Sequence, residues 1–404
     1  MRYRIAIQAK TPLAFRSEIN SLRGETLNYV PGTSLLGGLA QVHKALDRTP
    51  EEFTAFFVHG RIRFSNCYPA SFTIPALQND YDAVLPMPVT ARSCKRFSGF
   101  AFHAEEDGEP RAGVRDLLIP LALFAMSDEQ KSDILDPYQY HPCTYQPLDR
   151  LSGFFRRGQE ASHYGQPAVH TALRTRTGIN HMTGTAQSAI LYNRQVIERD
   201  TQFWGMWEVD DHLADMFDAC MTKIDESHLL RIGSNRTRGF GSIHIHTARQ
   251  KQDTLEDLRA RVEEFTQRLK RQAKQVGVAA PAALYVPVLL TSDAILTDKL
   301  LRSRLLVLPE DLEAVGIDDA ELVFHMGGMR QIKGWNSLWG LPKADEWSIT
   351  MGSVFLFALP NTSDATFKAL HLLQHQGIGL RRTEGFGNIA VAHPFHNELA
   401  EEYR

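Results

Sequence analysis

Hydrophobic residues near the start of the chain follow a strand pattern and then a helix pattern. Residues 2–9 alternate between polar and apolar side chains, which predicts an opening strand in the interior of a sheet. Residues 29–46 place apolar side chains at helical spacing after a turn at Pro31-Gly32, with Thr33 or Ser34 as the expected N-cap. The start of such a helix has free N–H groups, which can hold an anion.

The middle of the chain predicts a β-hairpin, a strand and a second helix. Arg174 and Arg176 lie on the same side of an extended segment, and a stretch rich in Gly, Asn and Thr follows as the expected hairpin tip. Residues 201–209 alternate as a strand. Residues 210–224 then predict a helix, capped by Asp210 or Asp211 and with a stripe of apolar side chains: Leu213, Met216, Phe217 and Met221.

The clearest helix pattern spans residues 252–275 and marks a domain boundary. Its apolar residues are spaced three and four apart among charges, and Gly277 ends it. Beyond it, the pattern predicts strands at 283–290 and 354–359 and a helix at 364–376.

One stretch of sequence occurs twice. Residues 233–246 read GSNRTRGFGSIHIH and residues 379–392 read GLRRTEGFGNIAVA, with seven identities at a constant offset of 379 − 233 = 146. Each copy passes from a helical segment through a glycine-rich loop into a strand. Glycines allow positive φ, and an arginine beside bare N–H groups attracts phosphate. The candidate phosphate contacts are therefore Arg236, Arg238, Gly239 and Gly241 in the first copy and Arg381, Arg382, Gly385 and Gly387 in the second.

The repeat suggests the architecture of the whole chain. Both halves share the order strand, helix, glycine loop, strand, which favours an α+β fold of two ferredoxin-like domains, each ending in a glycine-rich loop. We expect the first domain at 1–248 with a long insertion at about 61–200. A linking helix at 249–279 and a second domain at 280–404 would follow.

Basic and aromatic residues are interleaved in three further segments. Such mixtures suit a single-stranded nucleic acid, because its phosphates attract cations and its bases stack on flat side chains. The alternative is a solvated loop whose aromatic residues pack into the core. The segments contain Arg92, Lys95, Arg96 and Phe97; Arg150, Phe154, Phe155, Arg156 and Arg157; and Arg330, Lys333, Trp335 and Trp339.

Composition limits the classes of protein that fit. The 404 residues are 43% hydrophobic and contain no apolar run of transmembrane length, and Met1 leads directly into the first strand rather than into a signal peptide. Four scattered cysteines fit a reducing compartment, so we expect a cytoplasmic protein that needs no membrane and no cofactor. With a net charge of −3, any nucleic-acid binding must come from local basic patches.

Histidines offer two other kinds of site. His43 lies beside the apolar stripe of the first helix and is either a general base or an ordinary histidine at the surface or edge. His141 and Cys143 resemble half of a metal site, with His163 and His170 downstream. No second cysteine lies two or three residues from Cys143, so a zinc ribbon is not supported.

These residues together carry a family resemblance. The paired domains with G-x-x-R-x-x-G-F-G loops resemble the RAMP superfamily of CRISPR effector proteins, and residues 31–39 look like the motif that opens its first helix near the RNA. More narrowly, the chain is similar to the RAMP subunit of type III-D systems, grouped with the Cas5 type. The segments that carry the narrower likeness are 90–96, 113–116, 151–154 and 334–343.

The resemblance implies a non-catalytic subunit. Such proteins bind the repeat-derived 5′ handle of the guide RNA (crRNA), cap the backbone filament, and contact the large polymerase-like subunit and the backbone RAMP proteins; target RNA is contacted indirectly. Under this resemblance Ser34 joins the loop and patch residues as a candidate RNA contact. Relatives tend to carry cysteine pairs before the segment at 151–154, where this chain keeps only Cys143.

Two alternatives remain open at this point. A close branch of the superfamily cleaves repeat RNA without metal by means of a histidine base, a role open to His43 or His170. A third interpretation is a scaffold that touches only protein, through the apolar face of the helix at 252–275. The arginine-bearing loops argue against the scaffold, which has no need of them.

Overall fold

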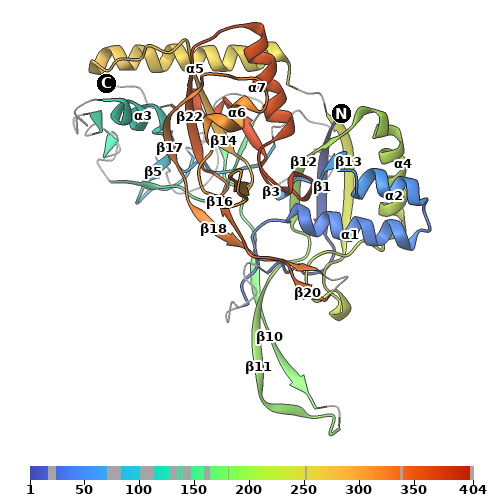
Figure 1. The fold of residues 1–404 in the computed structure, drawn as a ribbon. Helices are drawn as coiled ribbons and strands as arrows, with labels where there is room; N and C mark the ends of the chain where they lie inside the picture. Colours follow the sequence, from blue (N-terminus) through green and yellow to red (C-terminus); the bar gives the residue numbers. More distant parts are fainter. Residues whose placement is uncertain are drawn as a thin grey trace.

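The protein combines helices with antiparallel strand pairs in a computed structural model of residues 1–404 (Figure 1). The α+β class predicted from the sequence is confirmed. The structure describes residues 1–16, 24–70, 83–100, 113–127, 134–135, 138–139, 147–158, 164–180, 182–250, 253–336 and 340–400, without the side chains of 187–191 and 335–336.

The first half of the chain, residues 1–250, is built on one antiparallel sheet. Strand β1 (Arg2–Ala9) lies between β13 (Ile243–Gln250) and β12 (Gln202–Val209), and β12 also pairs with β2 (Ile62–Arg63) and β3 (Tyr68–Ala70). The interior position predicted for the first strand is confirmed. Because side chains alternate along β1, Ile5 and Ile7 face one core, while Ala6 faces another.

Helices α1 (Gly32–Ala45), α2 (Pro50–Phe57) and α4 (Ala214–Ser227) form the larger core of the first half. Leu35 and Leu39 of α1 are buried against the strands, as the helical stripe predicted. Each such side chain contributes about 1.5–3 kcal/mol when it leaves water.

The predicted helix starts were wrong in two places. The N-cap of α1 is Pro31, not Thr33 or Ser34, and the N–H of Gly32 already donates to Asn66 Oδ1 at 2.9 Å. In the second helix neither Asp210 nor Asp211 caps the start, because a 3₁₀ turn, η4 (Asp211–Leu213), precedes α4. Met216, predicted as part of the apolar stripe of that helix, is exposed.

The second half, residues 253–400, is built on a second antiparallel sheet. Its strands lie in the order β17 (Glu321–Met326), β22 (Val354–Leu359), β14 (Leu284–Leu290) and β23 (Ile389–Val391). All residues of β14 and β22 are buried, as expected for central strands covered on both faces. Both strands match the segments predicted from the sequence.

The α-helices described in this half are α5 (Leu255–Val276), α6 (Pro309–Glu313), α7 (Asp364–Gln376) and α8 (Phe395–Glu398). Helix α5 begins at a capping box on Thr254 and ends at Gly277, which has φ 71°. Its buried side chains Leu258 and Val262 pack in the main core of this half, and Phe265 and Leu269 pack in a second core. The apolar face that the scaffold interpretation would offer to a partner is therefore covered by the chain itself.

The segment between the two parts of the first sheet reaches across to the second half. Helix α3 (Leu118–Met126) packs with α5 and the second sheet. The strands that precede and follow α3 in the chain form two small three-stranded sheets. The first small sheet has the strand order β4 (Leu85–Pro86), β8 (Phe154–Arg157) and β9 (Tyr164–Gly165). The second has the order β6 (Val114–Asp116), β5 (Ala91–Cys94) and β7 (Leu148–Arg150).

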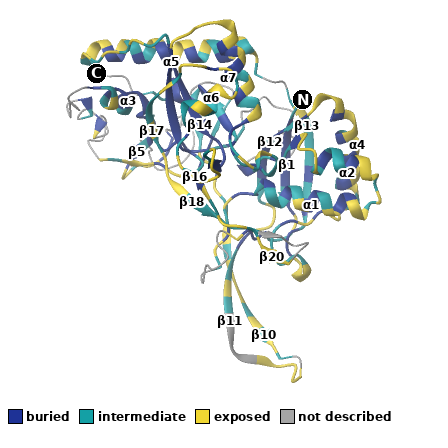
Figure 2. Ribbon diagram, in the orientation of Figure 1, coloured by how far each residue is buried: buried dark blue, intermediate teal, exposed yellow. Residues whose placement is uncertain are grey.

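A long hairpin projects from the body of the molecule (Figure 1). Strands β10 (Thr171–Ile179) and β11 (Ala186–Ile197) pair antiparallel, so the predicted hairpin is confirmed, and they form a two-stranded sheet of their own. Figure 2 shows mostly exposed residues along β10, in contrast to the buried strands of the two main sheets. The base of the hairpin is anchored, because Val196 and Ile197 are fully buried.

The second half also contains short strand pairs outside its main sheet. They are β15 (Leu296–Thr297) with β16 (Ser303–Arg304), β18 (Met329–Ile332) with β21 (Glu346–Ile349), and β19 (Trp335–Asn336) with β20 (Leu341–Pro342). No helix within the described ranges is long and apolar enough to cross a membrane.

Candidate nucleic-acid interface

The two copies of the repeated stretch adopt the same backbone conformation. Each contains a short 3₁₀ turn, η5 (Arg236–Arg238) or η6 (Arg382–Glu384), and an equivalent hydrogen bond closes each loop: Ile232 N–H to Gly241 O at 2.9 Å, and Ile378 N–H to Gly387 O at 2.8 Å. The residues with positive φ also correspond. In the first copy they are Gly233 (79°), Asn235 (61°), Gly239 (84°) and Gly241 (90°). In the second copy they are Gly379 (74°), Arg381 (55°), Gly385 (95°) and Gly387 (69°).

Close backbone contacts explain the last glycine of each copy. A Cβ atom at Gly241 would lie 2.3 Å from Ile232 O, and one at Gly387 would lie 1.8 Å from Ile378 O. Both distances are far below van der Waals contact, and both residues have positive φ. Only glycine therefore fits at these positions.

The second loop packs into the first half of the protein. A Cβ atom at Gly385 would lie 2.8 Å from Phe64 O, and the N–H of Phe64 donates to Thr383 O at 3.2 Å. Gly32, at the start of α1, approaches the same place, since its Cβ would lie 2.8 Å from Glu384 O. This loop joins the two halves, so its backbone is not open to a phosphate.

Acidic side chains neutralise part of the positive charge of the second loop. Arg381 pairs with Glu346 at 2.5 Å and with Glu384 at 2.7 Å, and Lys343 pairs with Glu384 at 3.0 Å. Burial alone would raise the pKa of Glu384, but hydrogen bonds from Arg381 and Lys343 outweigh it and hold that pKa below its usual value. Arg382 is exposed and donates to Gln376 O at 3.3 Å. Of the predicted phosphate contacts in this loop, only Arg382 presents an open charge.

The first loop is open instead. Thr237, Arg238 and Gly239 are exposed, and a Cβ at Gly239 would meet nothing within 4 Å. A hollow runs along this loop and the base of the hairpin. Its lining residues are Arg16, Tyr192, Arg194, Gly233, Ser234, Asn235, Arg236, Thr237 and Arg238. No carboxylate is among them.

We call Arg16, Arg176, Arg194, Arg236 and Arg238 the arginine surface. Their contacts are neutral: Arg238 donates to Tyr192 Oη at 2.8 Å, Arg194 donates to Ser234 Oγ at 3.1 Å, and Arg176 lies 4.6 Å from the centroid of the Phe240 ring. Arg236 donates to Gln41 Oε1.

In the part of the chain that the structure describes, no acidic side chain forms an ion pair with the arginine surface. None of the ion pairs found among the described residues includes these five arginines. Burial lowers the pKa of the Arg194 guanidinium, and Arg16, Arg176 and Arg238 lower it further through their like charge. Arginine stays protonated in proteins, so this concentration of positive charge attracts an anion such as an RNA backbone.

The hairpin extends this surface. Arg174 is exposed and lies opposite Arg194 in the strand register, and Arg176 lies opposite Tyr192. Like charges directly opposite each other destabilise an antiparallel pair. An anion bound between them would relieve that repulsion, and Tyr192 supplies a flat ring next to it.

The first basic–aromatic patch is only partly available. Arg92 is half-buried in β5 and donates to the carbonyl of Val89 at 2.7 Å. Lys95 and Arg96 are exposed, with Arg96 lying 5.4 Å from the centroid of the Phe97 ring. In the neighbouring patch the aromatic residues are not available, because Phe154 and Phe155 are buried, and Arg157 pairs with Glu398.

The patch of the second half is also engaged within the protein. Arg330 pairs with the buried Asp293 and donates to Tyr29 Oη at 2.6 Å, thereby joining the two halves. This pairing argues against the phosphate contact predicted for Arg330. Lys333 is half-buried. The side chain of Trp335 and all of Trp339 lie outside the described residues. Ser34 is half-buried on the first turn of α1.

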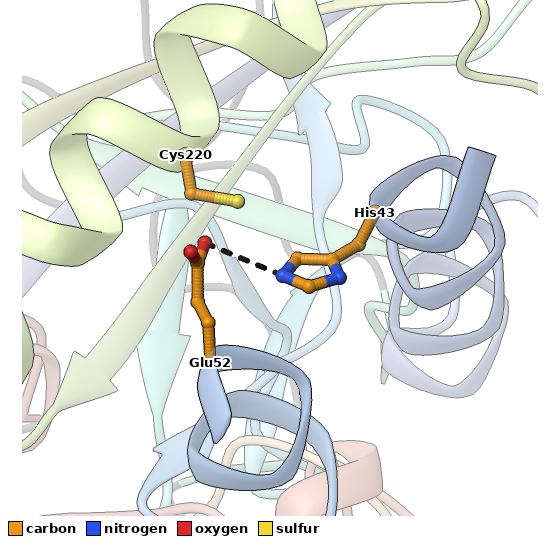
Figure 3. Close-up of side chains that lie close together, drawn as sticks. All are labelled: His43, Glu52 and Cys220. Atoms are coloured by element: carbon orange, nitrogen blue, oxygen red, sulfur yellow. Dashed lines mark ion pairs between the residues drawn. The ribbon is translucent and has the colours of Figure 1, made fainter. Parts of the chain in front are cut away.

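His43 is buried, so the expectation of a surface or edge histidine was wrong. It is 1% exposed, and its Nε2 lies 3.3 Å from Glu52 Oε1, with Cys220 adjacent (Figure 3). Helix α2 covers it with the rings of Phe53, Phe56 and Phe57. Burial lowers the pKa of His43, although Glu52 opposes this shift.

Most of the half metal site predicted around Cys143 lies outside the described residues. His141, Cys143 and His163 lie outside the described residues, and His170 is exposed. Sequence reasoning missed Arg16, Tyr192 and Arg194. Two of these residues could have been found from the predicted hairpin, because the pairing of β10 with β11 places Arg194 opposite Arg174 and Tyr192 opposite Arg176.

Comparisons with known proteins give weak similarities. No protein-family model matches the chain, and no curated protein resembles it in sequence. Among solved structures, it is similar to a chain of a type III-B Cmr-beta complex bound to cognate target RNA, at 13% identity and a TM-score of 0.40, covering 87% of this chain and 86% of that one.

Two further structures show the same kind of similarity. A chain of a type IV-B CRISPR complex is 13% identical over 63% of this chain and 93% of its own, with a TM-score of 0.25. Oligomeric Cmr4 from Pyrococcus furiosus is 14% identical over 61% and 98%, with a TM-score of 0.28. Identities and TM-scores this low do not by themselves establish a common fold or function.

Proposed function

We propose that this chain is a non-catalytic guide-RNA-binding subunit of a type III CRISPR effector ribonucleoprotein. In this proposal it is a RAMP protein that binds the repeat-derived 5′ handle. Its partners are the large polymerase-like subunit and the backbone RAMP subunits, and target RNA is contacted indirectly. The narrower kinship with the Cas5 group of type III-D systems is part of the same proposal and rests on the sequence motifs.

The strand order of the two sheets supports two ferredoxin-like domains. In the first half, β1, β2, β12 and β13 are strands 1, 2, 3 and 4 in chain order, and they lie side by side in the order 4-1-3-2. In the second half β14, β17, β22 and β23 lie in the same order, read from the other edge. A helix follows the third strand of each set, α4 or α7, and leads into the glycine loop and the fourth strand. This is the connectivity of a split βαβ domain.

The arginine surface is the single observation that carries the RNA-binding proposal. A protein with a net charge of −3 has no general attraction for nucleic acid. Four arginines line the hollow beside the open glycine loop, no carboxylate is among its lining residues, and Arg176 lies against Phe240 next to it, so phosphates are attracted locally. Tyr192 in the same hollow offers a stacking partner for a base.

The residues that would carry the nuclease alternative do not favour it. A general base must reach the proton that it abstracts. His43 is enclosed by α2, whereas His170 is exposed. Within the described ranges, neither histidine combines exposure with a hydrogen-bonded tyrosine or lysine. The proposal is therefore binding without cleavage.

Incubation with the repeat RNA tests this proposal. The purified protein should bind the RNA more tightly than DNA of the same sequence and leave every phosphodiester intact, as measured by filter binding and gel electrophoresis. His170→Ala should change neither result. A single specific cleavage product that disappears in His170→Ala would instead establish the nuclease interpretation.

A further inference from the structure

Three histidines and one aspartate gather where α4 ends and β13 begins. His244 Nδ1 lies 3.7 Å from Asp225 Oδ1, and His246 Nδ1 lies 3.9 Å from Asp225 Oδ2. The ring of His228 lies 5.1 Å from that of His244, centroid to centroid. None of these four residues belongs to the arginine surface, and none has a part in the proposed RNA contacts.

The local fold explains why these side chains meet. His244 and His246 are two positions apart on β13, so they project on the same side. Because β13 is an edge strand, it has open backbone groups, and the N–H of Ile245 donates to Asp225 Oδ1 at 3.2 Å. That bond holds the carboxylate between the two imidazoles. His228, with φ 53°, ends α4 in the left-handed region and turns the chain back toward β13.

The chemistry of this donor set is that of a transition-metal site. Ligand atoms of Asp225, His244 and His246 all lie within 4.8 Å of one another. Tetrahedral zinc needs donors about 2.0–2.2 Å from the ion, which sets them roughly 3.4 Å apart, so small side-chain rotations suffice. The three side chains are 25–37% exposed, and an ion can therefore enter from solvent.

The other cluster with metal-ligand side chains is a weaker candidate. In it Glu52 already accepts two hydrogen bonds from Arg48, at 2.6 and 2.8 Å. Arg48 therefore supplies the positive charge that a metal ion would bring to His43, Glu52 and Cys220 (Figure 3). The carboxylate of Asp225 has no arginine or lysine partner among the ion pairs of the described residues.

We propose that Asp225, His244 and His246 bind a divalent transition-metal ion, with zinc as the best fit, and that His228 or water completes the coordination. Two imidazoles and a carboxylate suit zinc better than magnesium or calcium, which prefer oxygen ligands. The ion would tie the end of α4 to β13. These are the two elements from which the arginine-bearing loop departs, so metal binding would stiffen the frame of that loop.

Titration of the purified full-length chain with Zn²⁺ alone tests the proposal. After removal of metal with a chelator, calorimetry should show one high-affinity Zn²⁺ per chain, and the melting temperature should rise with added Zn²⁺. The double variant His244→Ala/His246→Ala should lose at least about 100-fold in affinity, since even changes next to metal ligands cost 10–100-fold.

Two variants control for other histidines and for the buried cluster. His59→Ala removes an exposed histidine elsewhere, and Cys220→Ala removes a ligand from the cluster around His43; both should bind Zn²⁺ as the wild type does. Co²⁺ should give a visible absorption band that only the double variant loses. The proposal is overturned if the wild type binds no Zn²⁺, if the double variant binds it unchanged, or if Cys220→Ala abolishes binding.

Discussion

Replacing Arg194, Arg236 and Arg238 together with alanine should weaken binding of the repeat RNA by roughly 100-fold at physiological salt. Each arginine that contacts a phosphate releases condensed counterions, so three lost contacts should flatten the slope of log K against log salt by about 2. Fluorescence anisotropy over a range of salt concentrations measures both quantities. This result would place the RNA backbone along the hollow beside the first glycine loop.

A matched variant separates local contacts from total charge. Arg249, Arg259 and Arg302 lie on the surface, and each is paired with an aspartate. Changing these three to alanine removes the same formal charge but should leave the affinity and the salt slope nearly unchanged. If both triple variants lose binding equally, the arginine surface has no special role.

Gly387→Ala should cost about 2–5 kcal/mol of stability or prevent folding. The new Cβ would lie 1.8 Å from Ile378 O, and the backbone has φ 69°. An L-residue in this region costs about 1–2 kcal/mol, and forcing an extra group into packed structure adds about 1–3 kcal/mol. Urea unfolding followed by circular dichroism measures the change in the free energy of unfolding.

Gly239→Ala is the matched control for this effect. Gly239 also has positive φ, 84°, but a Cβ there would meet nothing within 4 Å. Its substitution should therefore cost only the backbone term of about 1–2 kcal/mol. Equal losses in the two variants would contradict the close packing that the structure shows at Gly387.

Helices and strands with a clear periodic pattern were predictable from the sequence. Helix α7 has the predicted bounds, and α5 differs by a few residues at its start, because an apolar stripe and a strong cap coincide in both. The start of α1 was not predictable in the same way. There Pro31 already fixes φ at −68° and Asn66, distant in sequence, binds the first N–H, so no side-chain cap is needed.

The burial of His43 depended on tertiary structure. Its position beside the apolar stripe favoured the surface or edge of the protein. The structure differs because α2 folds back and covers the imidazole with three phenylalanine rings. The contacts of Arg330 also depend on tertiary structure, because its partners Tyr29 and Asp293 lie far from it in sequence.

The repeat revealed where the loops are but not how they differ. Both were expected to hold phosphate, yet position 238 is arginine in the first copy and its equivalent, 384, is glutamate in the second. That difference was visible in the sequence, and Glu384 is the carboxylate that pairs with Arg381 and Lys343 in the second loop. The docking of this loop against Phe64 and Gly32 was not visible, because it depends on how the two halves pack.

Guide-RNA binding can be tested by sequencing the RNA that co-purifies with the protein from its native cells. RNAs whose 5′ ends derive from one CRISPR repeat should be enriched with the wild type and lost with the Arg194, Arg236 and Arg238 triple variant. Recovery of no RNA, or of bulk cellular RNA in equal amounts with both proteins, would contradict guide-RNA binding.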